Sequence, residues 1–236
     1  MTDAFALLFV GHCLADFVLQ TRAMVLGKER EPRWLLAHAL VVLAVQALVL
    51  VPAFPGFESL VAVTLVALLH LGLDHAKIRV QRRFGRRLTW FVLDQLLHLA
   101  TLVGAAALLE RAQVALEPRF AMPASWAWTI GLYAFNVHGG SAIVGGVLQR
   151  SRPPAEPVAG SPGVGQTIGI LERMVMLSFV LLGQWSALGF VLTAKSVARF
   201  KELENKEFAE TYLVGTLTSF LVAGSSGLLL ARILGS

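Results

Sequence analysis

Long apolar segments, separated by short polar ones, make up most of this sequence. Each is close to the length of about 20 residues that an α-helix needs to cross the hydrocarbon core of a bilayer. Inside lipid, backbone N–H and C=O groups have no water to bind, and a helix satisfies them within the segment. The sequence therefore predicts an all-α fold, a polytopic transmembrane helical bundle of about seven to eight helices in two halves.

The predicted helices divide into a four-helix membrane half over residues 1–110 and a C-terminal membrane half over residues 125–236. One apolar stretch, residues 167–199, is too long for one span and too short for two full ones. We predict that it breaks near Gly183–Ser186 into two short helices. A segment rich in proline, glycine and serine, residues 149–166, is expected to be a mobile connection. The predicted spans are residues 3–20, 34–51, 60–78, 89–109, 126–148, the pair within 167–199, and 209–230.

The charged residues of the chain are few and unevenly placed. They make up 15% of it, whereas a soluble domain has about 25%. The basic residues gather in the connections after the first, third, fifth and seventh spans. The positive-inside rule assigns these connections to the cytoplasm and both termini to the outside. The net charge of +5 therefore does not indicate nucleic-acid binding. The single cysteine, Cys13, excludes an internal disulfide framework.

Three histidine–aspartate pairs with the same spacing of four residues lie inside the predicted spans. The pairs are His12 with Asp16, His70 with Asp74, and Asp94 with His98. Residues four apart share one face of a helix, so each pair would present an imidazole and a carboxylate together. With the predicted orientation, the pairs and His38 lie in or near the cytoplasmic half of the membrane. Charged groups inside apolar spans are costly, so they indicate a functional site.

Imidazole and carboxylate are protein ligands of zinc, manganese and iron, and the cluster is predicted to bind one or two such ions, with no organic cofactor. The predicted metal ligands are His12, Asp16, His38, His70, Asp74, Asp94 and His98. The predicted catalytic residues are Asp16, Asp74 and Asp94, and the supporting ones are Gln20, Lys77 and Gln95. Lys77 shares a face with Asp74 and is expected to orient it, whereas His75 lies off that face. The alternatives are a proton relay without a metal, and polar contacts that only hold helices together.

A second charged group lies in the C-terminal half, near the same membrane surface. Its members are Glu172, Arg173, Lys195, Arg199 and Glu210. We predict an anion-binding site in which Arg173, Lys195 and Arg199 hold a phosphate, with the two glutamates in support. The alternative is internal ion pairing, of Glu172 with Arg199 and of Glu210 with Lys195, together with contacts to lipid headgroups.

Six motifs, three in each half of the chain, together resemble those of a known protein family. Those of the first half are GHCLADFVLQT, LLHLGLDHAK and FVLDQLLH, and those of the second are IGILERM, FVLTAKSVARFKELE and FAETYLVGTLTSF. Together they resemble an uncharacterised bacterial membrane family, domain of unknown function 3307, with the C-terminal extension of its longer members. The resemblance implies a multi-pass protein of the bacterial inner (plasma) membrane and no particular activity. A looser likeness is to predicted membrane-bound metal-dependent hydrolases, which also place histidine and aspartate in their early helices.

The sequence favours a membrane-embedded metal-dependent enzyme, a hydrolase acting at the cytoplasmic leaflet on a phosphorylated or lipid-linked substrate. Aspartate or histidine side chains that do not bind the metal would act as general base, and the cationic side chains would neutralise developing charge. The first alternative is a proton- or ion-coupled transporter that uses the same cluster, and the second is a non-catalytic membrane sensor or scaffold. The expected partners are the lipid bilayer, a lipid or phosphorylated small molecule and a second copy of the chain, but no nucleic acid.

Overall fold

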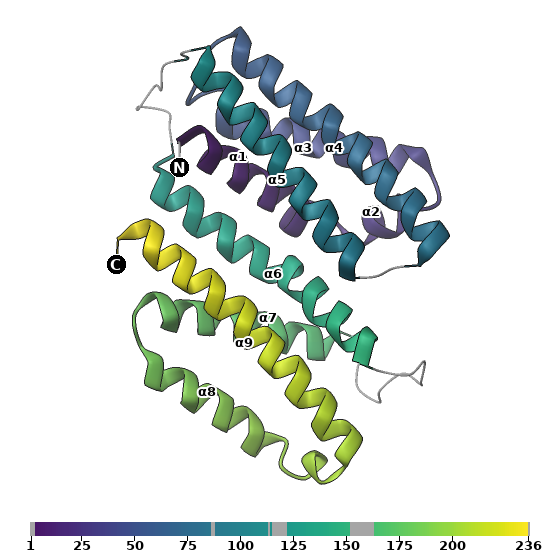
Figure 1. Cartoon of the computed structure of the whole chain (residues 1–236), viewed down its shortest axis with the longest axis vertical. Coiled ribbons are helices and arrows are strands. Elements are labelled where there is room, and N and C mark those ends of the chain that lie inside the picture. Colours follow the sequence, from purple (N-terminus) through teal and green to yellow (C-terminus); the bar gives the residue numbers. More distant parts are fainter. Residues whose placement is uncertain (1–2, 86–87, 113, 115–121, 152–162, 236) are drawn as a thin grey trace. The chain divides into compact units, whose positions relative to one another are not determined.

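A computed structural model of the chain describes residues 3–85, 88–112, 114, 122–151 and 163–235 (Figure 1). In these residues every regular element is a helix, which confirms the predicted all-α class. Residues 152–162 of the predicted mobile connection lie outside the described part. The chain divides into two compact units, Met1–Ala134 and Phe135–Ser236, and the boundary lies inside α6 (Ala124–Ser151). The sequence-based division into halves, with its boundary between residues 110 and 125, stays a prediction.

The first unit consists of helices that begin and end where the local sequence favours it. Its elements before α6 are α1 (Asp3–Leu14), a π-helical turn η1 (Ala15–Leu19), α2 (Arg22–Gly27), α3 (Pro32–Leu50), α4 (Phe57–Phe84) and α5 (Leu88–Arg111). The Thr21 side chain accepts a hydrogen bond from Met24 N and caps α2. Pro32 occupies the first turn of α3, where a missing N–H costs nothing. Gly85 ends α4 with a φ of +76°, which favours glycine.

α1 is the central helix of the first unit. Nine of its 12 residues are buried, so it has no face for solvent or lipid. α3 and α5 both pack against it, and α4 packs against each of these two. The start of α6 packs on α1 as well, with the Phe9 and Trp128 ring centroids 4.7 Å apart. Because α1 is enclosed, the polar side chains at its C-terminal end lie inside the unit.

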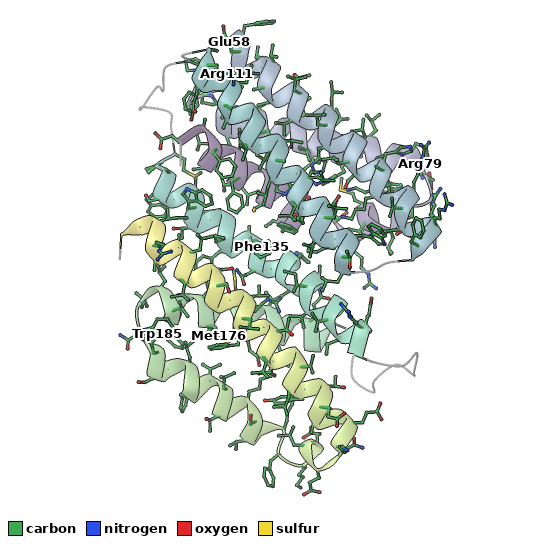
Figure 2. The ribbon with its side chains drawn as sticks, in the orientation of Figure 1. Glu58, Arg79, Arg111, Phe135, Met176 and Trp185 are labelled. Carbon is green, nitrogen blue, oxygen red and sulfur yellow. The ribbon has the colours of Figure 1, made fainter. Side chains whose placement is uncertain are left out.

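α4 and α5 form a long antiparallel hairpin. Figure 2 marks its two ends, with Glu58 and Arg111 at one and Arg79 at the other. The first basic connection packs at the Arg79 end, where the Arg82 guanidinium donates to the Glu29 carbonyl O. The basic segment before α3 and the basic C-terminal end of α4 therefore share one end of the unit.

The second unit contains the rest of α6 together with α7 (Val164–Leu181), α8 (Trp185–Ala198), a 3₁₀ turn η2 (Glu202–Glu204) and α9 (Lys206–Leu234). The predicted break in the apolar stretch is confirmed, because the chain turns between α7 and α8 at Leu182–Gln184. Gly183 makes this turn with a φ of +68°. α7 packs against both α8 and α9.

Four described helices, α3, α4, α5 and α9, are long and apolar enough to cross a membrane. Several of their leucines are largely exposed, such as Leu48, Leu68, Leu96 and Leu221. Exposed apolar surface of this extent is unusual in water but is what lipid requires. α8, with 14 residues, is shorter than a full span. Length and composition therefore support four of the seven to eight predicted spans.

The contact between α7 and α9 depends on Gly227. A Cβ atom there would lie 2.7 Å from the Val180 Cβ and 3.2 Å from the Leu177 carbonyl O. We expect Gly227→Ala to lower the free energy of unfolding by about 1–3 kcal/mol, because the helices must move apart. Gly224, one turn earlier, has no atom within 4 Å of such a Cβ, so Gly224→Ala is the matched control. Unfolding curves in detergent should show a loss of stability only for Gly227→Ala.

Candidate metal centre

Three ligand-type atoms converge at the centre of the first unit. His38 on α3 and His70 on α4 bring their Nε2 atoms to 2.9 Å from each other. The Asp16 Oδ1 atom lies 3.1 Å from the His38 nitrogen and 3.4 Å from the His70 nitrogen. Two ligands of one ion with bonds of about 2.1 Å lie about 3.4 Å apart in tetrahedral geometry and about 3.0 Å apart at right angles. The three atoms therefore have the mutual spacing of metal ligands.

Asp74 adds a second carboxylate to this group. Its Oδ2 atom lies 3.8 Å from the His70 Nε2 and 3.9 Å from the His38 Nε2. The Lys28 ammonium, from the end of α2, donates a hydrogen bond to the same oxygen. Both side chains of this pair are only 8% exposed. Sequence reasoning missed Lys28 because it belongs to a basic connection whose other residues gave no sign that one would turn inward.

Asp94 and His98 on α5 extend the cluster. The Lys77 ammonium donates to the Asp94 Oδ2 at 2.6 Å. From the sequence, Lys77 is expected to orient Asp74, but its ion pair is with Asp94. The His98 Nδ1 lies 2.8 Å from the Asp94 carbonyl O. A carbonyl only accepts, so this nitrogen carries the hydrogen, and Nε2 of the neutral ring holds a free lone pair. That Nε2 is buried and has no hydrogen-bond partner in the described residues, which is the state of a histidine ready to bind a metal.

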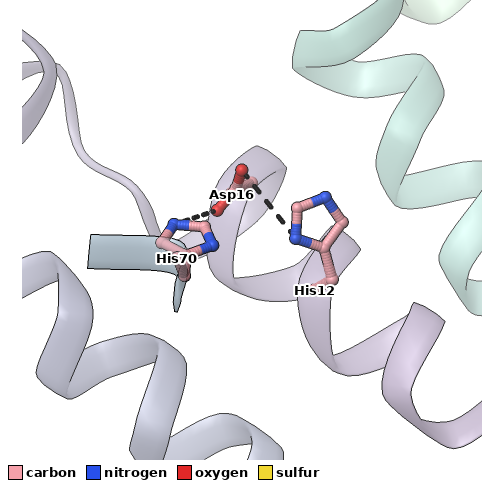
Figure 3. A group of neighbouring side chains, drawn as sticks. All are labelled: His12, Asp16 and His70. Atoms are coloured by element: carbon pink, nitrogen blue, oxygen red, sulfur yellow. Dashed lines mark ion pairs between the residues drawn. The ribbon is translucent and has the colours of Figure 1, made fainter. Parts of the chain in front are cut away.

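His12 connects the two parts of the cluster. Figure 3 shows Asp16 between the His12 and His70 rings, with the His12 Nδ1 4.0 Å from the Asp16 Oδ2. The His12 Nε2 lies 3.3 Å from the Gln95 Oε1. Its ring stacks on that of His98 with centroids 5.3 Å apart. His12 is thus placed to hold Asp16 in position or to bind an ion beside it.

The turn that carries Asp16 is π-helical, over Ala15–Leu19, and directly follows α1. Such turns are rare and occur often at functional sites. Gln20 then leaves the helix in an extended conformation, and its Nε2 lies 3.1 Å from the His38 Nε2. The spacing of His12 and Asp16 predicted a regular helix here, and no residue in the segment signals the wider turn.

All seven predicted ligands belong to one continuous cluster. The cluster contains three groups whose ligand atoms lie within 4.8 Å of one another, and neighbouring groups share His70 or Asp74. The groups are His12, Asp16 and His70; His38, His70 and Asp74; and Asp74, Asp94 and His98. Six of the seven residues are between 1% and 6% exposed, and the Asp16 side chain is 9% exposed. The structure brings these residues together, and their binding of a metal stays a prediction.

The buried charges of the cluster do not balance. Three carboxylates, Asp16, Asp74 and Asp94, meet two ammonium groups, those of Lys28 and Lys77. Asp16 has only imidazoles as contacts among the ion pairs of the described residues. An unbalanced charge in a buried, apolar setting is costly. A bound cation, a protonated histidine or a protonated carboxyl group would each balance the cluster.

The second charged group lies in the second unit, where Arg173, Lys195 and Arg199 line one cavity. The two ion pairs suggested from the sequence, Glu172 with Arg199 and Glu210 with Lys195, are wrong. The Lys195 ammonium donates to the Glu172 Oε2 at 2.6 Å, and Glu210 faces Lys206 at 4.0 Å with its side chain 67% exposed. Glu210 therefore does not join the group as predicted.

These observations define an all-α protein with membrane-length helices and a buried histidine–aspartate cluster. Residues 4–125 match the protein family of unknown function DUF3307, and the chain belongs to this family. The matched segment contains all seven residues of the cluster. No curated protein and no solved structure matches the chain.

Proposed function

We propose that the first unit binds a divalent metal ion, zinc, manganese or iron, and acts as a metal-dependent membrane enzyme. The observation that carries the proposal is the convergence of the His38, His70 and Asp16 ligand atoms within 2.9–3.4 Å. Asp74 is the fourth candidate ligand, and the lone pair of the His98 Nε2 supplies a candidate for a second ion. The added positive charge would also offset the carboxylate that lacks an ammonium partner.

The proposed reaction is hydrolysis of a phosphorylated or lipid-linked substrate. A bound divalent ion activates water and polarises the scissile group. Asp94 is the candidate general base, because Lys77 and Gln95 hold its Oδ2 and its Oδ1 has no hydrogen-bond partner in the described residues. Lys28 holds Asp74 in position. Asp16 and Asp74 would bind the ion and keep its position fixed.

We place this site at the cytoplasmic leaflet of the bacterial inner membrane, with about eight helices crossing or entering the bilayer. The first basic connection and the end of α4 share one end of the first unit, which supports a common side for both. Lys28, from that connection, reaches Asp74. An anionic headgroup attracted to the basic end would therefore lie close to the cluster.

An assay of the metal-loaded full chain tests the hydrolase proposal. Asp94→Asn should lower kcat for release of phosphate from phosphate esters or lipid phosphates by at least about 100-fold, because a general base contributes that much. Glu58→Gln makes the same chemical change at an exposed position at the far end of the hairpin and should leave kcat unchanged. Equal rates in Asp94→Asn and wild type would overturn the role of Asp94, and a wild-type protein without hydrolysis would overturn the reaction class.

The excess negative charge of the cluster favours a second candidate, a proton- or ion-coupled transporter. In that case a protonated histidine or a transported cation supplies the missing charge. Flux into proteoliposomes should then be lost in Asp74→Asn, without any requirement for a bound metal. A sensor or scaffold, the third reading, predicts that cluster variants fold normally and lose only a protein–protein contact.

A further inference from the structure

The second unit contains a cavity of about 580 Å³ whose charge is unbalanced. Residues of α6, α7, α8 and α9 line it. Three of the lining side chains are the cations Arg173, Lys195 and Arg199, and several walls are apolar, as at Val144 and Leu148. The proposed metal centre, in the first unit, does not involve these residues.

Arg173 is the most unusual of the three cations. It is 2% exposed, and its Nε and Nη2 atoms donate to the Asn136 carbonyl O at 2.8 Å and the Val137 carbonyl O at 3.2 Å. Nη2 also donates to the Ser141 Oγ at 2.5 Å. All of these acceptors are neutral, and no carboxylate contacts the guanidinium within the part of the chain that the structure describes. A buried charge without a counter-charge is costly unless a ligand supplies one.

Two glycines give the Arg173 side chain its position. A Cβ at Gly140 would lie 2.7 Å from the Arg173 Nε, and one at Gly169 would lie 3.4 Å from its Nη1. The Nη1 atom makes no hydrogen bond to any described residue. The guanidinium is therefore fixed on one side by α6 and keeps a donor for a partner in the cavity it lines.

Of the other two cations, Lys195 has a carboxylate partner and Arg199 has none among the described residues. The Lys195 ammonium is paired with Glu172 at 2.6 Å. The Arg199 guanidinium lies over the Phe208 ring, 5.9 Å from its centroid, and forms no ion pair with the described residues. Among the described residues, three cations and one carboxylate leave an excess of two positive charges at the cavity. The cavity also meets the first turn of α7 at Gly165 and Gln166, before the first hydrogen bond of the helix, where N–H groups favour anions.

We propose that this cavity binds a phosphate group, held by Arg173 and Arg199. Arginine binds phosphate through two parallel hydrogen bonds, and the Thr211 and Tyr212 side chains line the same cavity. The phosphate can belong to a phospholipid headgroup, whose chains would lie along the apolar walls, or to a free anion. The site is independent of the metal centre, so each proposal can fail without the other.

Binding to the detergent-purified full chain tests the proposal with three probes: dihexanoyl phosphatidic acid, inorganic phosphate, and uncharged dihexanoylglycerol. Calorimetric titration in a non-ionic detergent should show saturable binding of phosphatidic acid or phosphate and none of dihexanoylglycerol. Arg199→Gln should weaken that binding by at least about tenfold, because a charge-assisted hydrogen bond is lost. The Arg199 side chain forms no ion pair with the described residues and lies over the Phe208 ring, so this change should spare the fold, which circular dichroism checks.

Lys206→Gln is the matched control, since it removes one positive charge from a side chain that is 91% exposed and outside the cavity. It should leave the dissociation constant unchanged. Binding of phosphatidic acid alone identifies a lipid headgroup as the ligand, and binding of inorganic phosphate with similar affinity identifies the free anion. The proposal is overturned if neither phosphate probe binds, or if Arg199→Gln binds as tightly as wild type, or if Lys206→Gln weakens binding equally.

Discussion

Lys28→Met should lower the free energy of unfolding by about 3–5 kcal/mol, the cost of leaving one member of a buried ion pair alone. Lys28 and Asp74 are both 8% exposed, so little water is available to solvate the carboxylate once the ammonium is gone. Methionine keeps much of the length and apolar stem of lysine, which limits the effect to the lost charge. Thermal or denaturant unfolding of the full chain in detergent measures the change.

Two further variants make this result specific. Lys28→Met combined with Asp74→Asn should recover most of the lost stability, because neutral side chains replace both charges. Arg33→Gln removes a cation from an exposed pair with Glu31 and should change stability little. If Lys28→Met is as stable as wild type, Lys28 does not neutralise Asp74, and the charge balance described for the cluster is wrong.

His70→Ala should weaken metal binding by more than about 100-fold. The His70 Nε2 is 2.9 Å from His38 and 3.4 Å from Asp16, and His70 belongs to two of the three candidate ligand groups. A change outside the ligands themselves lowers metal affinity by about 10–100-fold, so losing a ligand should have a larger effect. Competition with a fluorescent zinc chelator, on the full chain in detergent, measures the affinity.

His75→Ala is the control for this experiment. His75 lies on the same helix as His70 but is exposed, and it takes no part in the cluster. The variant should bind metal as wild type does. Gln20→Leu removes an amide 3.1 Å from the His38 nitrogen. Its metal affinity should lie between those of the two variants, about 10–100-fold below that of the wild type. Equal metal affinity in His70→Ala and His75→Ala would contradict the assignment.

The sequence predicted the helices well where apolar runs set their positions. Residues 34–51 were predicted as a span, and α3 covers Pro32–Leu50. α4 extends beyond the predicted span 60–78, from Phe57 through charged residues to Phe84. The C-terminal end of α4 is polar but contains no helix-breaking residue before Gly85. Hydrophobicity predicts the extent of the apolar segment and not the extent of the helix. The six-residue α2 was missed because so short a helix, set between charged residues, leaves no periodic pattern.

The spacing of four residues identified the members of the cluster because it depends only on the geometry of a single helix. Contacts between helices depend on how each is rotated and on where it is placed along its neighbour. The hydrogen bonds of Lys77 to Asp94 and of Lys28 to Asp74 are contacts between different elements. So is the contact of Gln95 with His12. No pattern within one segment could have predicted them.

The ion pairs of the second unit show the same limit. α7 and α8 form a hairpin that turns at Gly183. Glu172 and Lys195 stand 11 and 12 residues from this glycine, so the two side chains face each other. Arg199 lies one turn after Lys195, directly past the end of α8, and lines the cavity instead. The break in the apolar stretch was predicted from the sequence, but predicting the ion pair also required knowing which residue makes the turn.

Elemental analysis by mass spectrometry, on wild-type protein purified in detergent without chelators, shows whether the cluster holds a metal ion. We expect zinc, manganese or iron in stoichiometric amount, and we expect the metal to be lost in a His70→Ala/Asp94→Ala double variant that keeps its helical circular dichroism. Wild-type protein without metal, or a double variant with its metal content unchanged, would contradict a metal centre. The histidine–aspartate cluster would then be a site for protons or transported ions.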